Sequence, residues 1–245
     1  MNRTGQKPHR HSSSITKVHM SNRGESAVSW LLTVAALAIA GVLVHREFFA
    51  PKPPWLDFPD PDAPPSYIEE WRELNTEGVA VGDANAPVVI VEFTDLECPF
   101  CRSFHETLQA TRKEWGEKIA VRFVHFPLPI HRNAYAAAKA AECAQEEGRF
   151  EQFIDAAFAK QDSLGIKPWL EYASLAGIAD TANFGTCFAD TSRVERVERG
   201  RALGALLKVK GTPTVIVNGW RFPTTPSDST FRRVVRDIID GKTPF

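Results

Sequence analysis

The sequence has almost no net charge and no internal repeat. Its 29 lysines and arginines are matched by 30 aspartates and glutamates, which leaves a formal charge of −1 over 245 residues. A protein that neutralises nucleic-acid phosphates concentrates basic residues. The composition therefore gives no reason to expect a nucleic-acid partner. With 43% hydrophobic residues, the chain has enough apolar material for a sizeable globular core.

Cysteine is scarce as well, because only four are present and only two of them are close together. Cys98 and Cys101 form a C-x-x-C pair, whereas the other two are 44 positions apart. A structural zinc site usually combines two close pairs, so we expect no metal site. Three histidines lie on different predicted elements, show no ligand spacing, and are expected to pack in the core or at its rim: His105, His125 and His131.

Charged residues are missing from residues 27–44, "AVSWLLTVAALAIAGVLV". As a helix this run spans about 27 Å, close to the ~30 Å of bilayer hydrocarbon. A cleaved signal peptide is the alternative, but its apolar core is usually shorter and is followed by a small-residue cleavage site. Here the A-x-A patterns lie inside the run. We therefore predict an uncleaved transmembrane anchor.

The segments on either side of this run predict its orientation. Five basic residues and one acid precede it, so residues 1–26 are expected to be a disordered cytoplasmic tail. Everything after residue 44 is then exported. Residues 45–66 hold seven prolines, which predicts a stiff spacer. The folded domain is expected over 67–245, opening with a short helix at 67–75 that a capping-box pattern favours.

The order of elements in that domain predicts an α/β class. Residues 88–93 read as a buried strand, a helix begins at the cysteines and ends near Trp115, and a second strand follows at 119–126. Residues 128–207 show only helical signals. A hairpin centred on Asn218 and Gly219 and an amphipathic C-terminal helix complete the chain. This is a thioredoxin fold with an inserted helical subdomain, preceded by one N-terminal transmembrane helix.

The junction of a strand and a helix gives the C-x-x-C pair a specific chemistry. Unpaired N–H groups at a helix N-terminus favour negative charge, so we expect Cys98 to have a low pKa and to be an exposed nucleophile. Cys101, one turn further, would resolve the mixed disulfide. A static structural disulfide is the alternative, although closing so short a loop constrains the unfolded chain by only about 2 kcal/mol.

A carboxylate stands in the first strand, at Glu92. Strand alternation places it on the same face as Val88 and Ile90. If both faces are covered, burial beside Cys101 should raise its pKa, and a neutral acid there could relay the proton of Cys101. The alternative is that Glu92 reaches solvent at the end of the strand.

Several segments together resemble the DsbA-like branch of the thioredoxin superfamily. They are "VEFTDLECPFC", "HFPLPIHRNAYAAAKAAECA", "GRFEQFIDAAF" and "VKGTPTVIVNG", within residues 75–240. The resemblance implies that Cys98 is the nucleophile, Cys101 the resolving thiol and Glu92 the acidic residue. It also implies that a cis Thr212–Pro213 bond lies opposite the disulfide, where Thr212, Pro213, Pro99 and Phe100 contact substrate.

Two features of the sequence refine this resemblance. The strongest oxidases of the family carry histidine at the position of Phe100, and Thr212 resembles the neighbour of the cis-proline in isomerases and milder relatives. Extreme oxidising power is therefore not expected. Cys143 and Cys187 lie on separate predicted helices, and we favour a structural disulfide between them over two free buried thiols.

Together these features predict a membrane-anchored, exported thiol–disulfide oxidoreductase that forms disulfides through its own cysteine pair, without a bound cofactor. Its partners would be exported proteins with thiols or disulfides and a membrane redox protein, and it would be a monomer at the inner membrane. The alternatives are a disulfide isomerase or reductase, or a peptide-binding chaperone with a static disulfide.

The predicted topology is directly testable. Protease added outside intact spheroplasts should digest the domain that follows residue 44, because the basic flank retains the preceding tail in the cytoplasm. The fragments can be followed with tags at each end of the chain. Protection of the C-terminal tag and loss of the N-terminal one would contradict the predicted orientation.

Overall fold

The computed structural model describes residues 22–48, 60, 63–192 and 194–245. It divides into two compact units, Met1–Asp57 and Phe58–Phe245. The predicted cytoplasmic tail before residue 22 and most of the proline-rich spacer lie outside the described residues.

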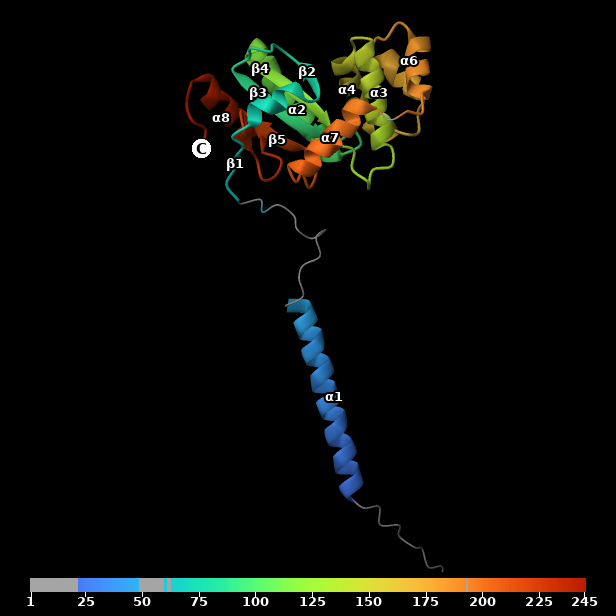
Figure 1. Ribbon diagram of the computed structural model, residues 1–245, viewed down its shortest axis with the longest axis vertical. Coiled ribbons are helices and arrows are strands. Elements are labelled where there is room, and N and C mark those ends of the chain that lie inside the picture. Colours follow the sequence, from blue (N-terminus) through green and yellow to red (C-terminus); the bar gives the residue numbers. More distant parts are fainter. Residues whose placement is uncertain (1–21, 49–59, 61–62, 193) are drawn as a thin grey trace, which may run out of the picture. The chain divides into compact units, whose positions relative to one another are not determined.

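The first unit contains one helix, α1, Asn22–Phe48 (Figure 1). Its stretch Ser29–Arg46 is long and apolar enough to cross a membrane, and none of that stretch is buried within the protein. Both a membrane anchor and an N-terminal signal sequence have this length and composition.

The second unit is built on one six-stranded sheet with the order β1-β6-β5-β3-β4-β2. β3 and β4 are parallel, and the other pairs are antiparallel. The strands span Ser66–Tyr67, Val79–Val81, Val88–Thr94, Ile119–His125, Thr214–Val217 and Trp220–Arg221, in the order β1 to β6. The predicted β-α-β unit is therefore present, with α2, Pro99–Trp115, between its two parallel strands.

β3 is buried along its whole length because both faces of the sheet are covered. Val88 and Ile90 pack in the larger core with α2, α8 and the helical insertion. Val89, Val91 and Phe93 pack on the opposite face. Their neighbours there include the 3₁₀ helix η2 (Trp71–Thr76) and Leu203 of α7 (Glu195–Leu206). The uninterrupted apolar run of this strand thus follows from its position in the middle of the sheet.

The helical insertion lies at one end of the sheet in Figure 1, and α8 lies at the other. α8, the predicted amphipathic C-terminal helix, buries Phe231, Val234 and Val235. The remaining helices are α3, Ala134–Glu146; α4, Phe150–Ala159; α5, Trp169–Leu175; α6, Thr181–Ala189; α7, Glu195–Leu206; and α8, Asp228–Ile239. Short 3₁₀ helices are η2, Trp71–Thr76; η3, Gly116–Lys118; and η4, Gln161–Ser163.

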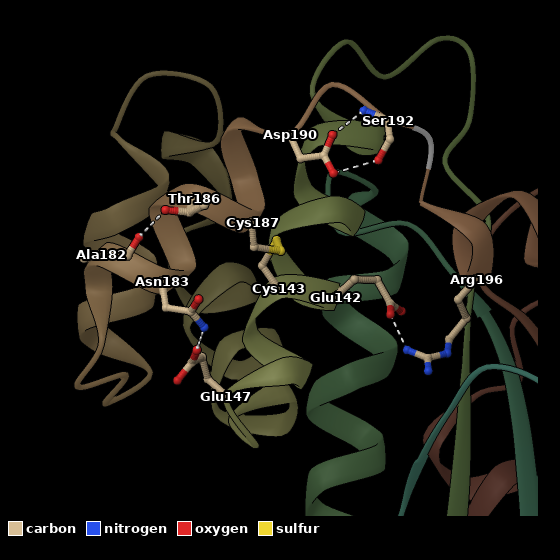
Figure 2. Close-up of a disulfide and its surroundings, with 10 residues drawn as sticks. All are labelled: Glu142, Cys143, Glu147, Ala182, Asn183, Thr186, Cys187, Asp190, Ser192 and Arg196. Atoms are coloured by element: carbon tan, nitrogen blue, oxygen red, sulfur yellow. Dashed lines mark hydrogen bonds and ion pairs between the residues drawn. A yellow bond between two sulfur atoms is a disulfide. The ribbon is translucent and has the colours of Figure 1, made fainter.

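Covalent and ionic contacts join the helices of the insertion (Figure 2). Cys143 of α3 and Cys187 of α6 form a disulfide, the pairing that the sequence favours. The carboxylate of Glu142, beside Cys143, accepts a hydrogen bond from Arg196 of α7. These contacts attach α3 to two later helices, 44 and 54 residues away.

The region before the first central strand differs from the prediction. Ser66 and Tyr67 form an edge strand paired with Arg221 and Trp220, so the helix predicted over 67–75 does not begin at residue 67. Only η2 follows, without a side-chain cap. The capping-box pattern failed because pairing with the sheet edge takes the backbone that would have started the helix. β2 was also not predicted, since it has only three residues.

The disulfide should contribute substantially to the stability of the folded unit. Replacing both Cys143 and Cys187 by alanine is expected to lower the free energy of unfolding by about 4 kcal/mol, because the bond closes a loop of 44 residues in the unfolded chain. Urea denaturation of both proteins without reductant, in a background that carries Cys98→Ser and Cys101→Ser, measures the difference. Equal stability would show that the bridge does not restrain the unfolded chain.

Candidate active site

The C-x-x-C pair lies where the chain passes from β3 into α2. Cys98 is the N-cap residue of α2 in extended backbone conformation, and Pro99 stands in the first turn, where no N–H partner is needed. The Cys98 N–H donates to the Asp95 carbonyl at 3.0 Å, which closes the connecting turn. Both cysteines are free thiols in the structure. The first thiol therefore lies at the N-terminus of a helix of 17 residues.

The pKa of Cys98 is lowered from 9.0 to about 6. The largest cause is a hydrogen bond from the Cys101 thiol, while burial opposes it. Thr212 and the backbone N–H groups of Cys101 and Phe100 lower the pKa further. Those N–H groups belong to the first helical turn, where backbone donors lack helical partners and the dipole favours an anion. At pH 7 a thiol with this pKa is about nine-tenths ionised.

Cys101 has the opposite electrostatic character. It is fully buried, and burial raises its pKa well above 9.0, with further contributions from Cys98 and Glu92. The Asp95 N–H points at its sulfur at 3.4 Å. Cys98 is therefore ionised near neutral pH. Cys101 stays protonated and donates a hydrogen bond to the Cys98 sulfur.

Cys98 is less accessible than the sequence suggested. Only 3% of its surface is exposed, so the expectation of an exposed nucleophile is wrong for this structure. The sulfur lies beside the loop before β5, 3.3 Å from the Thr212 carbonyl, to which it donates a hydrogen bond in its protonated form. A substrate sulfur that reacts with Cys98 must replace this contact.

The loop opposite the thiols contains a cis peptide bond between Thr212 and Pro213. Both residues are buried. The Thr212 hydroxyl lies close enough to Cys98 to lower its pKa, but it does not meet hydrogen-bond geometry with a partner among the described residues. On the other side of Cys98, Pro99 is exposed and Phe100 shows 67% of its surface. Of the four residues expected to contact substrate, Pro99 and Phe100 follow Cys98 directly in the sequence. Thr212, which precedes Pro213, contacts the Cys98 sulfur in space.

Glu92 is fully buried on the Cys101 side of β3, so it does not reach solvent. Burial raises its pKa from 4.5 to about 8, and the charge of Cys98 adds to this, whereas the hydroxyl of Thr94 opposes it. Neither carboxyl oxygen meets hydrogen-bond geometry with a partner in the described part of the chain. The side chain is therefore a largely neutral acid at pH 7.

Two acidic residues of the turn before Cys98 were not singled out from the sequence. The Asp95 carboxylate accepts hydrogen bonds from the Leu128 N–H and from His131, both at 2.8 Å. The Glu97 carboxylate accepts from the backbone and side chain of Asn133. They attach residues 95–98, which we call the redox turn, to residues 128–133 at the start of the helical insertion.

Gln161 was also missed. It lies in η4, and its side-chain amide donates to the carbonyls of Leu96 and Cys98 at 2.9 and 2.8 Å. These contacts join residues more than 60 positions apart, so no local pattern of the sequence signals them.

The three histidines lie beside carboxylates rather than together. His131 bonds to Asp95, as described above, and His105 Nε2 lies 2.8 Å from Asp155. His125 Nε2 lies 3.2 Å from Glu142. Within the described ranges, no cluster of three or more His, Cys, Asp or Glu side chains could hold a metal ion.

Comparisons with known proteins agree with this arrangement. A family model described as thioredoxin matches residues 74–237. The structure resembles alpha-DsbA2, a thiol-disulfide exchange protein of Wolbachia pipientis, with a TM-score of 0.58, 21% identity and coverage of 70% of this chain and 93% of that one. BdbD of Bacillus subtilis gives a TM-score of 0.52, 20% identity and coverage of 73% and 97%.

Curated relatives match only over part of their length. The Na(+)/H(+) antiporter NhaA 3 of Salinispora tropica is 37% identical over 143 residues, which are 57% of this chain and 21% of that protein. The chain thus spans about a fifth of this relative. The family model covers most of the folded unit, including Glu92, both cysteines of the pair and the cis-proline loop, and the chain therefore belongs to the thioredoxin family.

Proposed function

We propose that this protein is a membrane-anchored thiol–disulfide oxidoreductase that forms disulfides in exported proteins through the Cys98–Cys101 pair. The observation that carries the proposal is the difference between the two thiols. Cys98 has a pKa of about 6 at a helix N-terminus, and the buried Cys101 has a raised one. A static bridge has no need of such a difference, whereas exchange requires one reactive sulfur and one that resolves.

Oxidation of a substrate begins from the disulfide form of the pair. A substrate thiolate attacks the Cys98 sulfur, the bond to Cys101 breaks, and Cys101 leaves as a thiolate that takes up a proton. A second substrate thiolate then attacks the substrate sulfur of the mixed disulfide. The substrate disulfide forms, the bond to Cys98 breaks, and Cys98 leaves as a thiolate. Two electrons pass from the substrate to the pair, which ends as the dithiol present in this structure. No bound cofactor takes part.

The lowered pKa of Cys98 favours this direction. A stable thiolate is a good leaving group in the second step and stabilises the reduced pair. A pKa of about 6 in place of 9.0 corresponds to about 1.4 kcal/mol of stabilisation of the dithiol at pH 7. Phe100 contributes a backbone N–H but no cationic side chain, which agrees with an oxidant of moderate strength.

We assign Glu92 as the group that donates a proton to Cys101 when the Cys101 sulfur leaves. A thiolate formed at the fully buried Cys101 is unfavourable because it is desolvated. Glu92 is neutral below about pH 8 and can donate a proton to the leaving sulfur. In the reverse direction its carboxylate accepts that proton.

Substrate and membrane contacts follow from the same geometry. We assign Thr212, Pro213, Pro99 and Phe100 to an extended substrate segment, whose backbone would pair beside the cis-proline loop. α1 is assigned as the anchor because of its length and apolar composition. The folded domain would then act as a monomer outside the cytoplasmic membrane, and a membrane redox protein would reoxidise it.

Removal of the resolving thiol should trap substrates. In a Cys101→Ser variant of the full chain, the Cys98 thiolate can attack a disulfide of an exported protein and displace one of its sulfurs as a thiolate. The mixed disulfides should accumulate, because no second thiol of the pair releases them. The matched Cys98→Ser variant should accumulate none. Non-reducing electrophoresis after acid quenching of cells measures both. Equal trapping by the two variants, or none by either, would contradict the assigned roles and favour a static pair.

The role of Glu92 predicts a pH dependence with a definite sign. Glu92→Gln removes the donated proton and keeps the shape, so oxidation of a model dithiol peptide should slow by roughly 10²-fold, the scale of general acid catalysis. Because Glu92 loses its proton as the pH rises through about 8, the ratio of parent to variant rates should fall above that pH.

Stopped-flow measurements between pH 6 and 9 on the oxidised full-length proteins give this ratio. Thr111→Val, at a buried threonine of α2, serves as a control for a change in core polarity. A ratio near one throughout the range would exclude Glu92 as the proton donor.

A further inference from the structure

The redox turn receives a pair of hydrogen bonds from the helical insertion through one side chain. The Gln161 amide donates to the Leu96 carbonyl at 2.9 Å and to the Cys98 carbonyl at 2.8 Å. Gln161 is 7% exposed and Leu96 1%, so both bonds lie in the interior. A buried carbonyl that loses its donor costs free energy, and the two carbonyls are therefore strongly held in this orientation.

The segment that carries Gln161 is itself firmly attached. The Leu164 N–H donates to the Gln161 carbonyl at 3.0 Å, and the Tyr172 hydroxyl donates to the carbonyl of Lys160 at 3.2 Å. Asp162, the next residue, accepts a hydrogen bond from Arg102 of α2 at 3.1 Å. The amide thus occupies a defined position with respect to the first turns of α2.

We propose that Gln161 is a positioning residue of the redox pair, whose amide holds the carbonyls of Leu96 and Cys98 so that the Cys98 sulfur faces the N–H groups at the start of α2. The inference rests on the proposed function, since it assigns Gln161 to the same thiolate. Gln161 does not touch the sulfur and acts through the backbone of the N-cap residue.

The orientation of the Cys98 carbonyl fixes where the N–H groups of the first helical turn lie relative to the Cys98 sulfur, because both depend on the same backbone rotation. The carbonyl accepts the first hydrogen bond of α2, from the Arg102 N–H, at a long 3.2 Å, and the second donor from Gln161 fixes the same peptide group. Rotation of this group would turn the N-cap backbone and move the sulfur away from the N–H groups of Phe100 and Cys101. Hydrogen bonds to an anion weaken steeply with misalignment, so the thiolate would lose stabilisation.

Two substitutions test this role in the full chain in detergent. Gln161→Leu removes both donors at similar size. Gln161→Glu keeps the shape, but its carboxyl, which burial keeps protonated, can donate to only one of the two carbonyls. Gln152→Leu, at an exposed glutamine of α4, is the matched control for the same change in the same subdomain. Thiolate absorbance near 240 nm during a pH titration gives the pKa of Cys98, and equilibration with glutathione gives the redox balance.

We expect Gln161→Leu to raise the pKa of Cys98 by at least about half a unit, which is a threefold smaller ratio of thiolate to thiol. Gln161→Glu should raise it less, because its protonated carboxyl still donates to one of the two carbonyls. The glutathione equilibrium should move at least about threefold toward the oxidised pair in Gln161→Leu and less in Gln161→Glu, and the control should match the parent.

Unchanged pKa and redox balance in both variants, with only a lower denaturation midpoint, would reduce Gln161 to a structural residue and overturn the proposal. That result leaves the proposed function intact if the parent still exchanges with glutathione. A parent that does not exchange at all would instead overturn the proposed function and this inference with it.

Discussion

The burial of β3 on both faces is the constraint on which the site depends. Because the strand lies between two cores, a register shift of one residue would exchange the side chains of its two faces and disrupt the packing of both cores. Its carboxyl end therefore delivers the redox turn, and the N-terminus of α2 follows at a defined place. The same burial leaves Glu92 without solvent beside Cys101, so one packing arrangement produces both the helix terminus that stabilises a thiolate and the neutral acid to which we assign the proton of the buried thiol.

The chemistry of the pair comes from placing two identical groups in different surroundings. The sulfur at the N-cap faces backbone donors, which favour its anion, whereas the sulfur one turn further is surrounded by apolar side chains and a carboxyl group. Each effect strengthens the other, since the protonated Cys101 donates a hydrogen bond to Cys98. The helix dipole alone contributes only a fraction of such a difference.

The helical insertion takes part in the site rather than merely covering the sheet. Asp95, Glu97 and the carbonyls on either side of Glu97 all bond to residues of the insertion. The turn that carries Cys98 is therefore held at several points by polar groups of the insertion. The disulfide joins α3 and α6 within the same insertion. The chain thus uses cysteine in two ways: the Cys143–Cys187 pair forms a disulfide that joins two helices, whereas Cys98 and Cys101 are thiols.

Local patterns of the sequence determined the elements and the identity of the reactive pair. The C-x-x-C after an apolar run, the alternation that turns Glu92 inward and the Asn218–Gly219 turn between β5 and β6 are all short-range signals, because period and turn chemistry are properties of neighbouring residues. The tertiary structure alone decided that Ser66 joins a sheet edge, that Cys98 is nearly covered by Thr212, and that Gln161 reaches the redox turn. These contacts join residues separated by more than 60 positions, and they exist only once the core has brought the segments together.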